Sequence, residues 1–425
     1  MPKYGEFRKL QNLFESVYLI KDPYILKLCM ASLVSQDQPC DPIWIIIVGA
    51  SSSGKSEIIN AFSSCKGVIQ ISTLSTNTFA SGMKIAGVET SLLNRIGADT
   101  EKIGNGVITF KDLTSLLSER PDDKAIIMGQ LREIYDGHYV KQFGNGKEVN
   151  WNGKITVLAG ATHVIYDIKQ QYAAMGERFL MYNLIQPDGV EAADIGMTNQ
   201  ESGKMKDNRL MLAEAVARYK DEIFETPEET PYISPEFKKE LILLSEMATR
   251  ARSSVNRNWR SPQQEIKSVH PPEMPIRFAS TLQNLNRTLA VINWNETGKL
   301  VNYPEDKKMS YKIALDSINL ERRVAMQELS KYDIIHTSGL AVKLNLPTSS
   351  VKNTLEDLTA LKIADRVKGS GPRGDKWTIK TKYKEIMQKF ENIKELGGEL
   401  TEESLGEDNT HSIISAEDIK KSMEK

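Results

Sequence analysis

Short, mostly apolar runs alternate with segments of helical periodicity along the first half of the chain. The strand-like runs fall at residues 43–48, 68–71, 106–110 and 154–158. Apolar residues at helical spacing mark residues 7–35, with an interruption at Asp22 and Pro23, and then residues 57–62 and 124–135. Strands that alternate with helices are typical of the α/β class, in which the crossover helices cover a parallel sheet. We therefore predict a parallel sheet flanked by helices.

Glycine and proline interrupt this pattern further along the chain. Gly-Asn-Gly between two β-prone runs predicts a hairpin over residues 139–149. A polar, glycine-containing stretch from Pro187 to Asn208 breaks the pattern, and helices are predicted over residues 210–226 and 234–253. Residues 250–275 contain four prolines, so we expect a charged linker that is not one helix. An amphipathic helix follows from Ile276.

The pattern changes again beyond residue 320, to short helices followed by a hairpin. Helices are predicted at residues 321–331, 338–344 and 348–361, and strands at 364–368 and 376–380 around a glycine-rich turn. This order is that of a winged helix, with the recognition helix opening at Thr348. From Leu340 to Lys384 the sequence has ten Lys and Arg against four Asp and Glu, a net charge of about +6 that favours binding to phosphate backbones. Lys352 and Arg373 are the predicted DNA contacts here, although a winged helix can also bind only protein.

The overall charge of the chain is close to balanced, with 55 Lys and Arg against 56 Asp and Glu among 425 residues. Any basic surface must therefore be local. Three cysteines without metal-ligand spacing argue against a disulfide framework or a zinc site and fit a reducing compartment. The longest apolar run is only strand-sized, so we expect a cytoplasmic protein that does not enter the membrane. From residue 396 onward the chain is acidic, and we expect this tail to be disordered or to bind a partner.

The most specific motif follows the first apolar strand. Gly49-Ala50-Ser51-Ser52-Ser53-Gly54-Lys55-Ser56 matches the phosphate-loop pattern G-x-x-x-x-G-K-S, and a helix begins after it. The glycines allow backbone amides to point at an anion, which the helix N-terminus also favours. We expect this loop and the adjacent Glu57 to bind ATP, with Lys55 at the phosphates and Ser56 on Mg²⁺.

A carboxylate ends the strand at residues 106–110. In phosphate-loop ATPases a strand beside the first commonly presents an aspartate that holds Mg²⁺, and Asp112 is the candidate. Thr162 and His163 follow the strand at 154–158, at the end of the sheet where ligands bind in α/β proteins. Thr162 and His163 are therefore expected at the ligand-binding edge of the sheet, together with Asp112.

Taken together, residues 43–184 resemble the AAA+ ATPases in the type and the order of their motifs. Together with the pattern along the chain, this resemblance leads us to expect five segments: a helical lead-in (1–40), an ATPase core (41–190), a helical lid with linker (191–310), a winged-helix domain (311–395) and the acidic tail (396–425). It also implies that Thr162 or His163 senses the γ phosphate, that Arg178 is an arginine finger for the next subunit, and that Arg277 is the lid arginine. The C-terminal part is similar to that of MCM-like helicases of mobile elements, which implies a hexameric ring on DNA.

One departure from the family leaves the hydrolysis chemistry open. The family's strand usually ends in Asp-Glu, whereas this one ends in Lys111-Asp112. Either Asp112 holds the metal and the base lies elsewhere, for example at Glu133, or Asp112 is the base and Ser56 and the phosphates hold the metal. Both alternatives stay open at this point.

Several other residues have an ordinary structural interpretation beside the functional one. Arg178 can pair with Glu177 or Asp188 on the surface, and the Thr162 hydroxyl can simply cap a turn. The hairpin at 139–149 can be a structural ribbon, although Lys141 and Lys147 beside its turn suit a DNA-tracking element.

The sequence thus favours an ATP-hydrolysing DNA motor, a replicative or self-loading helicase of a phage or mobile element. Single-stranded or forked DNA is the expected partner of the ring, and duplex DNA that of the winged helix. The alternative is an ATP-dependent DNA-binding switch that regulates transcription or assembles a replication complex without unwinding. A third, weaker hypothesis is a defence ATPase whose acidic tail recruits an effector.

Overall fold

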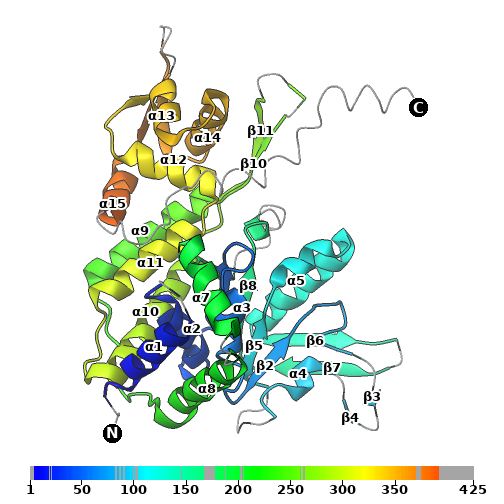
Figure 1. Ribbon diagram of the computed structural model, residues 1–425. Coiled ribbons are helices and arrows are strands. Elements are labelled where there is room, and N and C mark those ends of the chain that lie inside the picture. The colour runs from blue at the N-terminus through cyan, green and yellow to red at the C-terminus, as the bar shows by residue number, and fades with distance from the viewer. Residues whose placement is uncertain are drawn as a thin grey trace. The chain divides into compact units, whose positions relative to one another are not determined.

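A computed structural model describes residues 4–391, except for residues 19, 21, 82–83, 86–87, 90, 99, 101–103, 145, 167–177, 187, 202, 204, 259, 262–263 and 370–374 (Figure 1). The described residues belong to one compact unit, residues 1–393. The predicted acidic tail and the helix expected before Gly176 lie outside the described residues.

A five-stranded parallel sheet forms the centre of the first half, as predicted. Its order is β2-β5-β8-β1-β9. The strands are β1 (Trp44–Val48), β2 (Val68–Ile71), β5 (Gly106–Phe110), β8 (Ile155–Ala161) and β9 (Phe179–Asn183). Because β8 pairs with both β1 and β5, the strand after the hairpin lies between the phosphate-loop strand and the strand that leads to Asp112. The carboxyl ends of β1, β5 and β8 therefore meet at one edge of the sheet.

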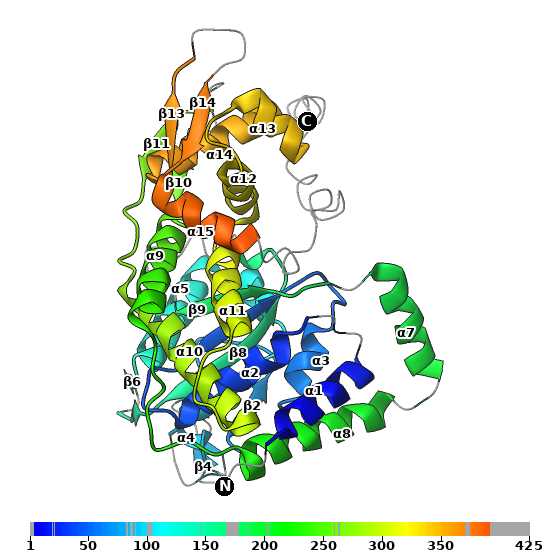
Figure 2. The same cartoon turned by 90° about the vertical axis from the view of Figure 1, so that its left-hand side faces the viewer.

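Helices cover the sheet because its central strands are buried on both faces. Trp44, Ile46 and Val48 share one core with α5 (Pro121–Tyr135) and with the hairpin β6 (His138–Gln142) and β7 (Glu148–Asn152). Helices α2 (Ile25–Val34) and α3 (Lys55–Asn60) pack against β8, and α1 (Glu6–Val17) packs against α8 (Met205–Arg218), as Figure 2 shows. The remaining short elements of this half are β3 (Lys84–Ile85), β4 (Val88–Glu89), α4 (Leu92–Arg95) and the 3₁₀ helices Ser35–Asp37 and Leu113–Ser118.

The helical region that follows differs from the sequence prediction in three places. Helix α7 (Gly189–Glu201) occupies the polar stretch that was expected to break the pattern. A hairpin of β10 (Val255–Arg257) and β11 (Ile266–Val269) lies in the proline-containing linker, where the prolines exclude a helix but leave short strands possible. Helix α11 (Pro304–Asp316) was not predicted and packs against β9, so the domain boundary placed at residue 311 falls inside a helix. The other elements are the π-helical turn Tyr219–Ile223, α9 (Pro235–Ala251) and α10 (Ile276–Thr297).

The last elements occur in the predicted order. They are α12 (Leu320–Ser330), β12 (Ile335–His336), α13 (Thr337–Leu344), α14 (Thr348–Ala360), β13 (Ala364–Val367), β14 (Lys376–Ile379) and α15 (Thr381–Glu391). The three strands form an antiparallel sheet in the order β12-β14-β13. Trp377 is fully buried, and its indole N–H donates to the Thr337 hydroxyl at 2.8 Å, so this side chain belongs to the core of the sheet. None of the helices in the described ranges is long and apolar enough to span a bilayer.

Candidate functional site

The phosphate loop turns sharply between β1 and α3. Gly54 has φ +85° immediately before the first helical residue, a conformation that glycine adopts without strain. At Gly49 a Cβ atom would lie 2.8 Å from the Ser53 hydroxyl and 2.9 Å from the Gln186 side-chain amide, so a larger residue here would displace these two side chains. The loop thus has the backbone geometry that its sequence motif requires.

Lys55 is held over this loop. Its ammonium group donates to the carbonyl oxygens of Gly49 at 2.8 Å and Ala50 at 2.5 Å, and the side chain is almost fully buried. Burial lowers the pKa of Lys55 by desolvation, and the negative charge of Asp112 opposes this shift. The Asp112 carboxylate is therefore near enough to Lys55 for the two charges to interact.

A threonine that the sequence reasoning missed joins the ends of β5 and β8. The Asp112 carboxylate accepts from the Thr114 amide at 2.8 Å and caps the 3₁₀ helix that begins at Leu113. The Thr114 hydroxyl accepts from the Thr162 amide at 2.9 Å, and the two threonine hydroxyls lie 3.3 Å apart. Asp112 and Thr162 are thus brought together, whereas the neighbouring His163 is exposed. A threonine two residues after an aspartate has no distinctive spacing by which it could have been found.

Replacing Thr114 with valine should loosen this junction. Valine keeps the shape but cannot accept from the Thr162 amide, so the free energy of unfolding should fall by about 1 kcal/mol. ATP turnover should fall as well, because Thr162 loses its hydrogen bond to residue 114, whose backbone amide still holds Asp112 in the variant. Both are measured by denaturation and by phosphate release. Thr230→Val, at an exposed threonine, is the matched control, and equal behaviour of the two variants would contradict this role of Thr114.

The residues proposed to hold Mg²⁺ suit that ion. The Ser56 side chain and the Asp112 carboxylate are both exposed at this edge, and Mg²⁺ prefers hard oxygen ligands, usually one or two from the protein together with phosphates and water. Within the described ranges no group of three or more His, Cys, Asp and Glu residues could hold a metal by itself. A site here would therefore depend on the nucleotide's own phosphates.

Glu57 takes part in a contact between helices. Its carboxylate accepts from the Arg209 Nε at 2.7 Å and from the Tyr18 hydroxyl at 3.1 Å. Burial, followed by the charge of Glu57, raises the pKa of Tyr18. Glu57 thus ties the first turn of α3 to α8 and to the end of α1, and its expected contact with nucleotide stays a prediction.

A second cluster that sequence reasoning missed lies at the end of β9, next to Val48. Asp316 accepts from the Asn183 amide at 2.9 Å and from the Lys312 ammonium at 2.6 Å, and it also pairs with Arg323. Lys312 donates to the Asn183 carbonyl at 2.6 Å. The spacing of four residues between Lys312 and Asp316 is the one sequence signal that pointed to an ion pair here. Through this cluster α11 and α12 contact the edge of the sheet that carries the phosphate loop.

The two arginines expected at the nucleotide lie at the opposite edge of the sheet. Arg178 precedes the first residue of β9, is 9% exposed, and pairs with Asp136 at 2.8 Å. Its guanidinium lies over the Tyr135 ring, with 5.5 Å to the ring centroid. Tyr135 in turn packs on Trp44, the first residue of β1. β1 separates this edge from the phosphate loop by about 13 Å. Asp136 is thus a partner of Arg178 that the sequence did not suggest, whereas the expected partner Glu177 lies outside the described residues.

Arg277 belongs to the same edge. Tyr135 has its pKa raised by burial, and the charges of Arg277 and Arg178 lower it. The Tyr135 hydroxyl lies 3.5 Å from that of Thr281, which is one helical turn from Arg277. Arg277 pairs with Glu273 at 3.2 Å. The structure therefore does not bring Arg277 to the phosphate loop of its own subunit, because α10 packs its first turns near the amino ends of the strands.

The predicted DNA-binding residues have different surroundings. Lys141 donates to the Thr76 carbonyl at 3.1 Å, and desolvation by burial lowers its pKa, so it anchors the hairpin to the preceding loop. Lys147 is exposed on the hairpin, and Lys352 is half-exposed on α14. Arg373 lies outside the described residues.

No protein-family model matches this chain, and no curated protein matches it.

Proposed function

We propose that this protein binds and hydrolyses ATP at the edge formed by the phosphate loop, Asp112 and Thr162. The observation that carries the proposal is the burial of Lys55 over a correctly turned loop, with Asp112 close enough to influence its pKa. A glycine-bounded turn before a helix N-terminus is a general anion site, and a lysine over it supplies the charge that phosphates require. The order of the motifs across the sheet supports a resemblance to AAA+ ATPases.

The residues of this edge have complementary roles in such a reaction. The loop amides and Lys55 bind the phosphates and balance the charge that develops on the γ phosphoryl group. Mg²⁺ held by Ser56 and the nucleotide would supply further neutralisation of this charge. Glu133 lies in the last turn of α5, two residues before Tyr135 at the opposite edge, so it is badly placed to act as the base. This favours Asp112 as the carboxylate that orients the attacking water.

An oligomer would complete the site. Arg178 and Arg277 both lie at the edge opposite the phosphate loop, so neither reaches the nucleotide of its own subunit. A ring in which this edge of one subunit faces the phosphate loop of the next would use both, and a hexamer is the ring size that the resemblance suggests. Arg178 is the only arginine in the sequence between Arg132 and Arg209, which leaves few candidates for an arginine finger.

DNA is the proposed partner of the assembly. The order of α12, α13, α14 and the β13–β14 hairpin supports a winged helix, and its excess of about six positive charges favours a phosphate backbone. The exposed Lys147 on the β6–β7 hairpin supports a contact with DNA inside a ring. We therefore infer a DNA motor, with a helicase as its most specific form.

One observation favours the alternative of an ATP-dependent DNA-binding switch. Lys141 is held by the loop at Thr76, so the β6–β7 hairpin contacts its own core through one of its two candidate lysines. A hairpin fixed to its own core in this way is compatible with a protein that changes conformation with the bound nucleotide, and also with one that moves along DNA.

A strand-displacement assay separates the two functions. The wild-type protein with Mg·ATP is incubated with a forked duplex, and both phosphate release and strand separation are measured. A motor is expected to show turnover that DNA stimulates together with strand separation. Turnover that DNA stimulates without strand separation would identify the switch, and no turnover at all would overturn both. Lys66→Ala, at an exposed lysine beyond α3, is the control variant and should match the wild type in both measurements.

A further inference from the structure

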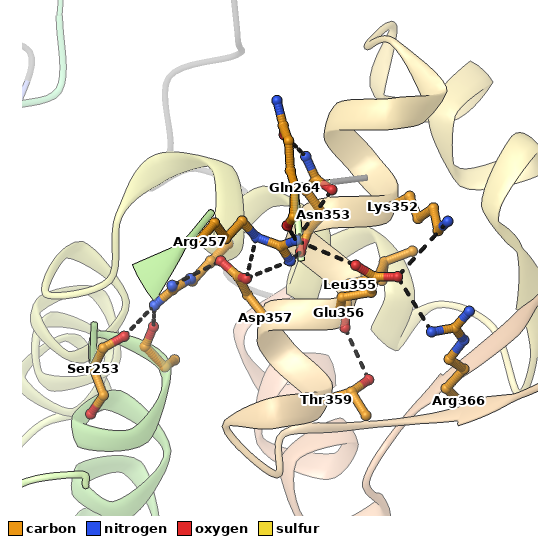
Figure 3. A network of polar contacts seen from close by, with 12 residues as sticks. Ser253, Arg257, Gln264, Lys352, Asn353, Leu355, Glu356, Asp357, Thr359 and Arg366 are labelled. Carbon is orange, nitrogen blue, oxygen red and sulfur yellow. Dashed lines mark hydrogen bonds and ion pairs between the residues drawn. The ribbon is translucent and has the colours of Figure 1, made fainter. Parts of the chain in front are cut away.

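Helix α14, the hairpin β10–β11 and strand β13 are joined through one carboxylate. Glu356 on α14 lies 3.4 Å from Arg257 of β10, 3.9 Å from Lys352 one turn earlier on α14, and 3.3 Å from Arg366 of β13 (Figure 3). Three cations from three elements therefore surround a single negative group.

The three cations differ in their freedom to move. The Arg257 side chain is 4% exposed and is fixed by further bonds to the Asp357 carboxylate at 2.7 Å and the Asn353 carbonyl at 2.6 Å. Lys352 and Arg366 have side-chain exposures of 52% and 30%. Ion pairs at such exposure contribute little to stability, because water screens their charges. Arg366 also pairs with Asp375, and its guanidinium lies 5.3 Å from the centroid of the Trp377 ring. Arg257 is thus a structural anchor, whereas Lys352 can exchange partners at small cost and Arg366 can exchange Glu356 while Asp375 still holds it.

Arg257 also reduces the negative charge that α14 presents. Asp357 accepts from both Arg257 and Arg322, and Arg322 in addition donates to the Ser253 carbonyl at 2.6 Å. The helix that was predicted to read DNA therefore carries two acidic residues, both of which are paired with arginines. A phosphate backbone would therefore meet acidic side chains that arginines already balance, beside the partly exposed cations of Lys352 and Arg366.

We propose that Glu356 takes the place of a DNA phosphate. Its carboxylate holds Lys352 and Arg366 until the backbone of duplex DNA displaces it. This inference rests on the proposed function, because it specifies how the same C-terminal elements take their DNA partner. The hairpin β10–β11, through Arg257, positions α14 for that contact. Glu356 in this arrangement weakens DNA binding, so the basic surface does not bind every polyanion at full strength.

The test is a variant that should bind DNA more tightly. Glu356→Gln keeps the size of the side chain and removes its charge, which releases Lys352 and leaves Arg366 paired with Asp375 alone. Binding of the full chain to a short labelled DNA duplex is measured by fluorescence anisotropy over a series of salt concentrations. We expect affinity to rise about three- to tenfold, and the slope of log K against log salt to steepen by about one, as for one more phosphate contact.

Matched variants decide whether the gain has this cause. Glu214→Gln, at an exposed position of α8, removes the same charge elsewhere and should leave binding unchanged. Adding Lys352→Gln to Glu356→Gln should remove most of the gain. Equal affinity of Glu356→Gln and wild type would overturn the proposal while wild-type binding still supports the proposed function. If the wild type and the variant both fail to bind duplex DNA, this proposal and the duplex-binding role of the winged helix are both overturned. A misfolded protein could not produce a gain.

Discussion

Replacing Lys55 with alanine should reduce ATP turnover by about two to three orders of magnitude, as for the loss of one charged group that stabilises the transition state. The ammonium of Lys55 is the buried cation of the phosphate loop, and no other lysine lies within residues 43–65. Nucleotide binding should weaken too, because the loop amides alone cannot balance the phosphate charge. Phosphate release and binding of a fluorescent ATP analogue measure the two effects.

A second substitution at Lys55 tests whether this residue is only structural. Its amine also supports the carbonyl groups of Gly49 and Ala50, so alanine could act by loosening the loop. Lys55→Met keeps the length and apolar bulk of the side chain and should be as inactive as Lys55→Ala. Thermal unfolding should show both variants folded. Wild-type turnover in either of them would refute the site.

The phosphate loop was readable from sequence because its determinants are local. Gly49, Gly54 and Lys55 act within one turn of backbone, and the apolar run before them could only be a buried strand. The central strands were equally clear, because parallel strands buried on both faces lack polar alternation. These local signals sufficed to predict the parallel sheet and the edge where Asp112 and Thr162 meet.

The remaining features depend on tertiary packing. The position of Arg277 follows from the packing of Thr281 near Tyr135, which no spacing in the sequence encodes. The β10–β11 hairpin has strands of only three and four residues, in which polar and apolar side chains are mixed, so its pattern resembles that of a loop. The contact of Asp316 with Asn183 joins positions 133 residues apart. Such contacts could be found only once the helices had been placed against the sheet.

Replacing Arg178 with alanine should reduce turnover by about three orders of magnitude or more, if the arginine enters the site of a neighbouring subunit. A residue that acts in trans can be complemented. A mixture of Lys55→Ala and Arg178→Ala subunits should regain part of the activity that each lacks alone, because some interfaces then combine an intact phosphate loop with an intact arginine. Phosphate release is measured over a range of mixing ratios.

The ion pair with Asp136 provides the control for this result. Arg178 is buried against Asp136 and Tyr135, so its loss could simply destabilise the edge of the sheet. Asp136→Asn breaks the same pair but keeps the guanidinium. If Arg178 is a finger, Asp136→Asn should retain turnover, because the arginine becomes easier to extend toward a neighbour. If Arg178 only holds its own subunit together, both variants should lose stability and activity in parallel, and mixing should restore nothing. The second pattern would leave the phosphate loop intact as a nucleotide site and remove the argument that Arg178 completes it from the next subunit.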